Sequence, residues 1–327
     1  MSKLLEVEDL EVSFKTYAGE VQAVRDVSFY VDRGESIAVV GESGCGKSTI
    51  ANSIVGLHDE NYTKESGEII YHDENVVNYS EDQMNKIRGK EIGFIFQDPL
   101  ASLNPLQRIG MQIEEPLVYH TDLNKNQRHE KVISLLKQVG ISKPERTARQ
   151  FPHQLSGGMR QRVLIAIALS CRPNIIIADE PTTALDVTIQ AQILDLLSGL
   201  QKEINAGIIL ITHDLGVVAQ MADRVAVMYA GEIVELADAK ELFESPLHPY
   251  TRSLLKSIPQ SDASDSELHV IKGMVPSLKN LPRIGCRFAT RIPYIDKDEH
   301  EENPVLHQVS ENHFVRCTCW KNFRFES

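Results

Sequence analysis

The segment from Gly41 to Ser48 reads G-E-S-G-C-G-K-S and matches the phosphate-binding pattern G-x-x-x-x-G-K-S. An apolar, strand-like run precedes it and a helical pattern follows, which is the context that the pattern requires. Glycines let backbone N–H groups turn toward phosphates, and the helix adds its positive N-terminal end. The residues predicted to bind a nucleotide are Gly41, Glu42, Ser43, Gly44, Cys45, Gly46, Lys47, Ser48 and Thr49.

Within this loop, Lys47 is expected to reach the β- and γ-phosphates, and the Ser48 hydroxyl to bind Mg²⁺. The alternative, a glycine-rich turn without function, is disfavoured by the strand before it and the helix after it. Cys45 is expected to turn its small side chain away from the nucleotide rather than to act as a redox switch.

The hydrophobic pattern predicts an α/β fold. Residues 1–40 alternate apolar and polar positions, which indicates strands over Leu4–Phe14, Val27–Val31 and Ser36–Val40. Short β-branched runs then alternate with helical patterns, which predicts βαβ units and a mostly parallel sheet covered on both faces. The runs are Ile92–Phe96, Ile175–Ala178, Ile208–Thr212 and Arg224–Tyr229, and the helices Arg128–Val139, Met159–Ser170 and Thr188–Glu203.

Composition restricts where the chain works. The formal net charge of −12 disfavours nonspecific binding to nucleic acid or to anionic lipid. No run approaches the ~20 apolar residues that span a bilayer, and the N-terminus lacks the apolar stretch of a signal peptide. We therefore expect a cytoplasmic protein that meets a membrane only through protein partners. The five cysteines are an odd number and disfavour a disulfide framework.

Two further predicted strands end in residues suited to phosphate chemistry. Ile175–Asp179 ends in a carboxylate that, at the C-terminal end of a parallel strand, is expected to hold Mg²⁺. The next residue, Glu180, can polarise the attacking water. His213 follows the run Ile208–Thr212 and is expected to sense the γ-phosphate.

The segment Gln154–Arg162 reads Q-L-S-G-G-M-R-Q-R and resembles the L-S-G-G-Q signature of ABC transporter ATPases. The resemblance implies that Ser156, Gly157 and Gly158 close over an ATP held by a partner subunit, so that two chains enclose two nucleotides. Met159 replaces the usual glutamine, a variant similar to the first, D-type, ATPase subunit of peptide importers.

The other sequence motifs of that family occur in the usual order over roughly residues 4–250. Gln97 is similar to the glutamine that links Mg²⁺ or water to the membrane subunit. It is therefore expected both to take part in catalysis and to bind Mg²⁺. Ala184–Asp186 resembles the loop that crosses the dimer interface. The family stacks an aromatic ring on adenine, and Phe14 and Tyr17 both remain candidates.

The C-terminal part resembles the extension of oligopeptide, dipeptide and nickel importers. The motif that carries this resemblance is Ser245–Arg252, S-P-L-H-P-Y-T-R. We expect it to form a turn that closes the domain and to have no catalytic role. The expected organisation is an ATPase domain over residues 1–250, with a helical subdomain over roughly 98–172, and an extension over 251–327. A polar stretch, Gln260–Ser266, is expected to be a linker.

In some members of this family, four cysteines in the extension hold an iron–sulfur cluster. Here Cys286 and Cys317 occupy two of those positions, whereas Ile292 and Glu299 stand at or near the other two, and Cys319 is extra. The sequence therefore favours free thiols over a cluster. The alternative is a zinc site of three cysteines with His300, His307 or His313 as the fourth ligand.

The resemblance implies an ATP- and Mg²⁺-dependent subunit that energises an importer from the cytoplasmic face of the membrane. The implied partners are a second, related ATPase subunit, two transmembrane permeases and, through them, an extracellular substrate-binding protein. Peptides are the first choice of cargo and nickel or a metal chelate the second. Two competing hypotheses are a soluble ABC ATPase of translation or DNA repair and a purely regulatory nucleotide-binding module.

Overall fold

The computed structural model describes residues 3–17, 19–183, 185–257, 278–280 and 284–325. Ala184 and the predicted linker Gln260–Ser266 lie outside these residues. The chain forms two compact units, each described by itself below. Unit 1 holds Met1–Leu4, Val31–Ser36 and Asn78–Ile211; unit 2 holds Leu5–Tyr30, Ile37–Val77 and Thr212–Ser327.

Unit 1 is built on three parallel strands with β7 in the middle, flanked by β6 and β8. Every residue of β7 and β8 is buried, and the only polar residue of each strand is its last, Asp179 and Thr212. The bounds are β6 Ile92–Ile95, β7 Ile175–Asp179 and β8 Gly207–Thr212.

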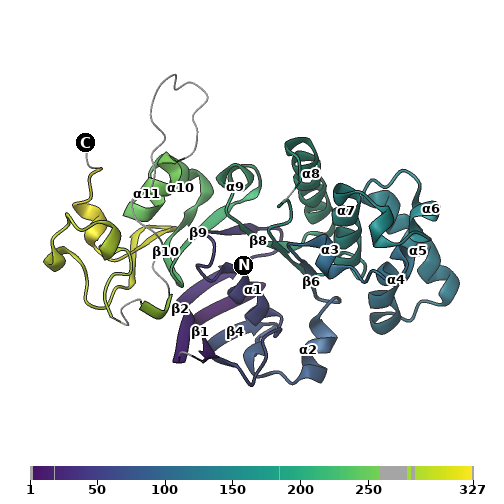
Figure 1. Cartoon of the computed structure of the whole chain (residues 1–327), viewed down its shortest axis with the longest axis horizontal. Coiled ribbons are helices and arrows are strands. Elements are labelled where there is room, and N and C mark those ends of the chain that lie inside the picture. The colour runs from purple at the N-terminus through teal and green to yellow at the C-terminus, as the bar shows by residue number, and fades with distance from the viewer. Residues whose placement is uncertain (1–2, 18, 184, 258–277, 281–283, 326–327) are drawn as a thin grey trace. The chain divides into compact units, whose positions relative to one another are not determined.

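Helices make up most of the remainder of unit 1, drawn in teal at the right of Figure 1. Side chains at their first turns fix where several of them begin. Asn124 accepts hydrogen bonds from two backbone amides of α5, and Gln127 reaches back to complete a capping box. The helices are α2 Glu81–Ile87, α3 Pro99–Ser102, α4 Ile109–His120, α5 Lys125–Gln138, α6 Pro144–Ala148, α7 Gly157–Ala168 and α8 Val187–Ile204, with 3₁₀ turns at Val76–Asn78 and Pro152–Gln154.

Unit 2 contains an antiparallel sheet of order β2-β1-β4-β5. Its long strands alternate buried and exposed residues, because only one face of the sheet is covered. The bounds are β1 Leu5–Thr16, β2 Gly19–Val31, β4 Thr63–Tyr71 and β5 Glu74–Asn75, and the helix of this part is α1 Lys47–Ile54.

A second sheet of unit 2 has the order β11-β12-β10-β9-β3, in which β3 and β9 are parallel and the other pairs antiparallel. The strands are β3 Ser36–Val40, β9 Arg224–Tyr229, β10 Glu232–Asp238, β11 Leu306–Ser310 and β12 His313–Arg316. The helices are α9 Leu215–Met221, α10 Ala239–Glu244 and α11 Pro249–Lys256, and 3₁₀ turns occupy Leu278–Asn280, Ala289–Arg291, Lys297–Glu299 and Cys319–Lys321.

The core of this sheet unites the ATPase part and the C-terminal extension. Tyr229 of β9 packs against Tyr250 of α11 and against Phe288, with ring centroids 4.8 and 5.1 Å apart. All three rings are buried in one cluster that also contains Cys286, Cys317 and Cys319. The extension thus completes the hydrophobic core that β9 and β10 begin.

The expected α/β class, with antiparallel and parallel sheets, is confirmed. The strands predicted over Ser36–Val40 and Arg224–Tyr229 have those bounds, whereas the strand predicted over Val27–Val31 is only the last part of β2, which begins at Gly19. The other predicted strands are correct to within a residue or two at each end. The hairpin β11–β12 was not predicted, because β11 is largely exposed and shows no alternation. Within the described residues, no helix is long and apolar enough to span a bilayer.

Candidate nucleotide site

The predicted phosphate loop connects β3 to α1 in unit 2, as the sequence motif requires. Two of its glycines are needed for close backbone packing. A Cβ on Gly41 would lie 2.2 Å from the carbonyl oxygen of Met228, and Gly46, at φ +105°, would bring a Cβ within 2.7 Å of the Ala23 carbonyl oxygen. The loop therefore follows a path that residues with side chains cannot take.

Lys47 extends its buried side chain back into this loop. Its Nζ donates hydrogen bonds to the carbonyl oxygens of Gly41, at 2.8 Å, and Glu42, at 3.1 Å. An ammonium group enclosed by backbone in front of a helix N-terminus is a donor set that fits anionic phosphate oxygens. The loop is thus shaped for phosphates by its backbone and carries one fixed positive charge.

Cys45 is buried in the same loop, and its backbone oxygen accepts a hydrogen bond from Gly231. Burial raises the pKa of its thiol, which opposes formation of the nucleophilic thiolate. These features favour the structural role expected from the sequence over a redox switch.

The loop is also held by Tyr250 and by Arg291 of the C-terminal extension, contacts that the sequence motifs did not reveal. The hydroxyl of Tyr250 accepts a hydrogen bond from the Glu42 amide at 3.0 Å. Arg291 forms an ion pair of 3.1 Å with the Glu42 carboxylate, and its guanidinium lies over the rings of Tyr229 and Phe288. The segment Ser245–Arg252 therefore does more than close the domain, because its Tyr250 supports the phosphate loop directly.

We expect a double-mutant cycle of Glu42→Gln and Arg291→Met to give a coupling energy of about 1–2 kcal/mol in the free energy of unfolding, because Arg291 is almost fully shielded from solvent. The measurement is urea unfolding of the wild type, both single variants and the double variant. The exposed pair Arg172–Glu203 serves as the control and should couple by no more than about 0.5 kcal/mol. Equal coupling in the two pairs would contradict this prediction.

In unit 1, Asp179 is buried at the end of β7 and Glu180 follows it in a left-handed conformation, with φ 46°. The structure brings Glu180 together with a second predicted residue. Oε2 of Glu180 accepts hydrogen bonds from Nε2 of Gln97 and from the Thr183 hydroxyl, both at 2.8 Å. These two neutral donors orient the carboxylate.

The signature segment forms the start of α7. The Ser156 hydroxyl caps this helix by accepting a hydrogen bond from the Met159 amide at 3.3 Å. A Cβ on Gly158 would lie 2.8 Å from Cγ2 of Ile189, so this glycine permits close packing on α8, whereas Gly157 has room around it. The capped, glycine-rich N-terminus is able to offer amides to an anion.

The remaining predicted residues lie in unit 2 and are exposed or partly so. His213 follows β8 with an exposed side chain, and Asp214 next to it caps α9. Tyr17 is fully exposed, whereas Phe14 is partly buried and meets His58 edge-on, with ring centroids 5.4 Å apart. The structure does not decide which of the two stacks on adenine, so both remain candidates.

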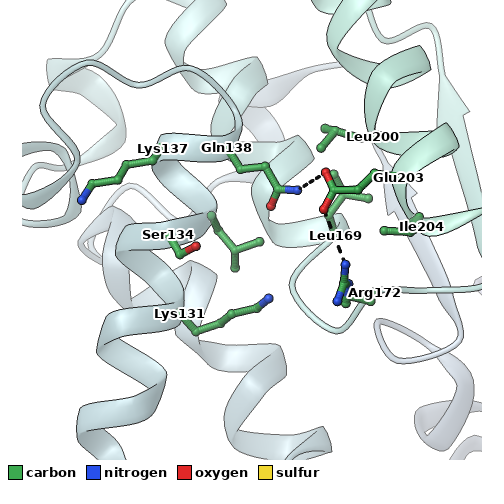
Figure 2. A pocket seen from close by; sticks show the side chains of 10 residues that line it. Lys131, Ser134, Lys137, Gln138, Leu169, Arg172, Leu200, Glu203 and Ile204 are labelled. Atoms are coloured by element: carbon green, nitrogen blue, oxygen red, sulfur yellow. Dashed lines mark hydrogen bonds and ion pairs between the residues drawn. The ribbon is translucent and has the colours of Figure 1, made fainter.

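A cavity of about 560 Å³ opens in unit 1 between α5, the end of α7 and the end of α8. Figure 2 shows Glu203 at its wall, paired with Gln138 on one side and with Arg172 on the other. Lys131 and Lys137 also line it. None of the residues predicted to bind nucleotide or metal lines this cavity, so it is separate from the predicted site.

His313, at the start of β12, is held between two carboxylates. Its Nε2 lies 2.7 Å from Glu235 and its Nδ1 lies 3.1 Å from Glu241. Burial alone would lower its pKa, but the two acidic partners outweigh burial and raise it. Because both ring nitrogens are engaged, His313 is not the fourth ligand of a cysteine site.

A raised folded-state pKa stabilises the fold below the unfolded-state value of about 6.5, and this contribution is lost as the pH rises through the folded-state pKa. We therefore expect the free energy of unfolding to fall as the pH rises above about 6.5. In His313→Gln this pH-dependent component should disappear, whereas in the exposed-site control His153→Gln it should remain. Urea unfolding across this range measures it, and an unchanged pH dependence in His313→Gln would refute the assignment.

Comparisons with known proteins identify the family to which these sequence motifs and this fold belong. Residues 24–183 match the ABC transporter family, and residues 234–297 match the oligopeptide/dipeptide transporter C-terminal region. The chain is 51% identical to the oligopeptide transport ATP-binding protein OppD of Lactococcus lactis subsp. cremoris, over 98% of this chain and 96% of that protein. The chain belongs to the ABC transporter family of oligopeptide and dipeptide ATP-binding proteins.

Other members of this ABC family are similarly close. OppD of Bacillus subtilis is 52% identical over 97% of this chain and 88% of that protein. The dipeptide transport ATP-binding protein DppD of Lactococcus lactis subsp. cremoris is 49% identical over 96% of this chain and 90% of that protein. Among solved structures, the dimeric ATP-binding cassette MJ0796, bound to ADP and Pi, superposes with a TM-score of 0.65 at 31% identity, over 72% of this chain and 98% of that one.

Membership in the ABC family confirms the predicted fold and ATPase class. The first matched region includes the phosphate loop, Gln97, the signature segment and Glu180, and the second includes Tyr250 and Arg291. The support that the extension gives to Glu42 therefore joins the two matched regions within unit 2. The family binds ATP, which fits the phosphate loop described above.

Proposed function

We propose that this chain hydrolyses ATP to energise a membrane importer of oligopeptides or dipeptides. The observation that carries the proposal is the level of identity, about half of all residues over nearly the whole chain, to peptide transport ATP-binding proteins. The identity extends through the C-terminal extension, which ATP-binding cassettes need not possess. We propose the boundary between the ATPase domain and this extension near residue 250, with a helical subdomain over roughly 98–172.

The chain's own residues have distinct roles in this reaction. Lys47 binds the β- and γ-phosphates, Glu180 orients and polarises the attacking water, and His213 contacts the γ-phosphate. Ser156, Gly157 and Gly158 cover the ATP of a partner subunit. The hydroxyl, amide and carboxylate oxygens of Ser48, Gln97 and Asp179 are a donor set that suits Mg²⁺, which supplies charge neutralisation at the phosphates when bound.

We propose that the chain is peripheral to the cytoplasmic face of the membrane and works through permeases. Unit 1 exposes several large apolar side chains between Phe96 and Tyr119, just after the glutamine that bonds to Glu180. We propose that these side chains contact a permease. The residues are Leu100, Leu106, Met111, Val118 and Tyr119. Two permeases, a second related ATPase subunit and an extracellular substrate-binding protein complete the proposed assembly, and nucleic acid has no part in it.

The test is substrate uptake in the source organism with the gene deleted. We expect uptake of labelled oligopeptides or dipeptides to be lost, uptake of nickel to be unchanged, and the wild-type chain to restore peptide uptake. The variant Lys47→Met, expressed at the same level, should not restore it.

Loss of nickel uptake with intact peptide uptake would replace the proposed cargo with nickel or a metal chelate. Intact uptake of both, together with a defect in translation or DNA repair, would favour the soluble ABC ATPase class instead. Both outcomes would refute the proposed peptide importer.

A further inference from the structure

Four side chains with metal-binding atoms meet in the C-terminal extension: Cys286, His300, Cys317 and Cys319. One ligand atom from each lies within 4.8 Å of the ligand atoms of all the others. They come from separate segments, since Cys286 precedes the turn at Ala289–Arg291, His300 follows that at Lys297–Glu299, and the last two cysteines follow β12. We propose that these four residues bind one Zn²⁺ ion as a Cys₃His site.

The donor set and its geometry suit this ion. Zn²⁺ takes four ligands tetrahedrally, with Zn–S distances of about 2.3 Å, which places neighbouring sulfur atoms roughly 3.8 Å apart. The observed grouping therefore needs only small side-chain movements to close around an ion. Three thiolates and one imidazole are a soft ligand set that favours zinc over Mg²⁺ or Ca²⁺. With all four positions filled by protein, the site would be structural rather than catalytic.

Burial and hydrogen bonding support the same conclusion. All three cysteines are buried, and within the described residues neither ring nitrogen of His300 has a hydrogen-bond partner, although both are shielded from solvent. A buried polar atom without a partner is costly, and coordination of an ion would satisfy one of these two nitrogens. The Glu301 amide donates to Sγ of Cys317 at 3.5 Å, the kind of support that thiolate ligands commonly receive.

An iron–sulfur cluster fits these residues poorly. The group offers only three thiolates, one fewer than the four that such a cluster usually takes. A four-iron cluster binds each thiolate to a different iron and so holds its ligands farther apart than a single ion does. Of the three histidines considered as the fourth ligand, His307 is paired with Glu301 and His313 with two carboxylates, which leaves His300.

The proposed ion has a structural consequence for the nucleotide loop. Five residues after Cys286, Arg291 reaches Glu42 of that loop, and Arg287 donates to the carbonyl oxygen of Ala230. By binding Cys286 together with Cys317 and Cys319, the ion would crosslink the segment that carries both arginines to the residues after β12. The site therefore would stabilise the support of the phosphate loop without touching the nucleotide.

The experiment is metal analysis of the full-length chain, purified under reducing conditions without chelators from cells grown with zinc and iron. We expect about one zinc per chain and neither iron nor acid-labile sulfide. Titration of the native wild type with a thiol-specific mercurial should release this zinc, as measured with a chromogenic indicator. Replacement by Co²⁺ should give the visible absorption of tetrahedral cobalt bound to thiolates.

Variants identify the ligands. Zinc affinity should fall at least about tenfold in His300→Ala and in Cys319→Ser, whereas His300→Cys should retain the metal as a Cys₄ site. The matched controls, His307→Ala and Cys171→Ser, should bind zinc as the wild type does. If a ligand variant does not fold, the mercurial titration and the cobalt spectrum of the wild type still decide the question.

Iron with sulfide in the wild type, a chain purified without metal that does not take up zinc, or wild-type affinity in His300→Ala would each overturn the proposal. The result is independent of cargo and of ATP turnover. Failure of the zinc site would leave the proposed importer function intact, and the converse also holds.

Discussion

Glu180→Gln is expected to retain ATP binding and to lower steady-state hydrolysis by about 10²–10⁴-fold, the contribution of a positioned general base. The amide keeps the size and shape of the carboxylate. Gln97 and Thr183 both donate to the same carboxylate oxygen, and the amide oxygen of a glutamine can accept both hydrogen bonds in its place, so the local structure should persist. Only the negative charge that polarises water is lost.

The measurements are phosphate release by the assembled transporter and equilibrium binding of a fluorescent ATP analogue. The control is Glu203→Gln, which removes a carboxylate from the surface of the same unit and should hydrolyse ATP at the wild-type rate. Near-normal turnover in Glu180→Gln would show that another group activates the water. Loss of nucleotide binding would instead indicate a structural role for Glu180.

Lys47→Met should lower ATP hydrolysis by about 10²–10³-fold, the cost of removing one preorganised donor to the charge that develops in the transition state. Methionine preserves most of the apolar stem of the buried lysine, so the packing in front of α1 changes little. The hydrogen bonds from Nζ to the carbonyl oxygens of Gly41 and Glu42 disappear, together with the charge that binds the phosphates.

In contrast to Glu180→Gln, this variant should also bind ATP more weakly. Circular dichroism and thermal unfolding of the free protein distinguish lost chemistry from lost folding. Lys137→Met, a surface change in unit 1, is the matched control. If Lys47→Met bound and hydrolysed ATP as the control does, the loop would not be the phosphate site.

The strands and motifs of this chain could be predicted because their causes are local. Buried parallel strands such as β7 and β8 need apolar residues on both faces, so they appear in the sequence as unbroken runs. The phosphate loop has a similarly local cause, since its glycines are set by the turn between β3 and α1. The capping of α7 by Ser156 follows from its place before a helical pattern.

What could not be predicted depends on contacts between distant residues. The Glu42 amide meets the Tyr250 hydroxyl across 208 positions, and its carboxylate meets Arg291 across 249 positions. Strands β11 and β12 exist because β10 provides an edge for β12 to pair with, not because their own pattern demands a strand. The choice of His300 over two other histidines likewise rests on which partners the folded chain gives to each.

The contacts of Glu42 with Tyr250 and Arg291 limit how this protein can be divided. A fragment that ended at residue 250 would stop inside α11, lack Arg291 and leave Tyr229 without its Phe288 neighbour. Such a minimal cassette would lose part of the scaffold of its own phosphate loop. For the same reason, grafting this extension onto an unrelated cassette would fail unless matching partners for Tyr250 and Arg291 were supplied. The two sequence regions have to be exchanged, truncated or redesigned together.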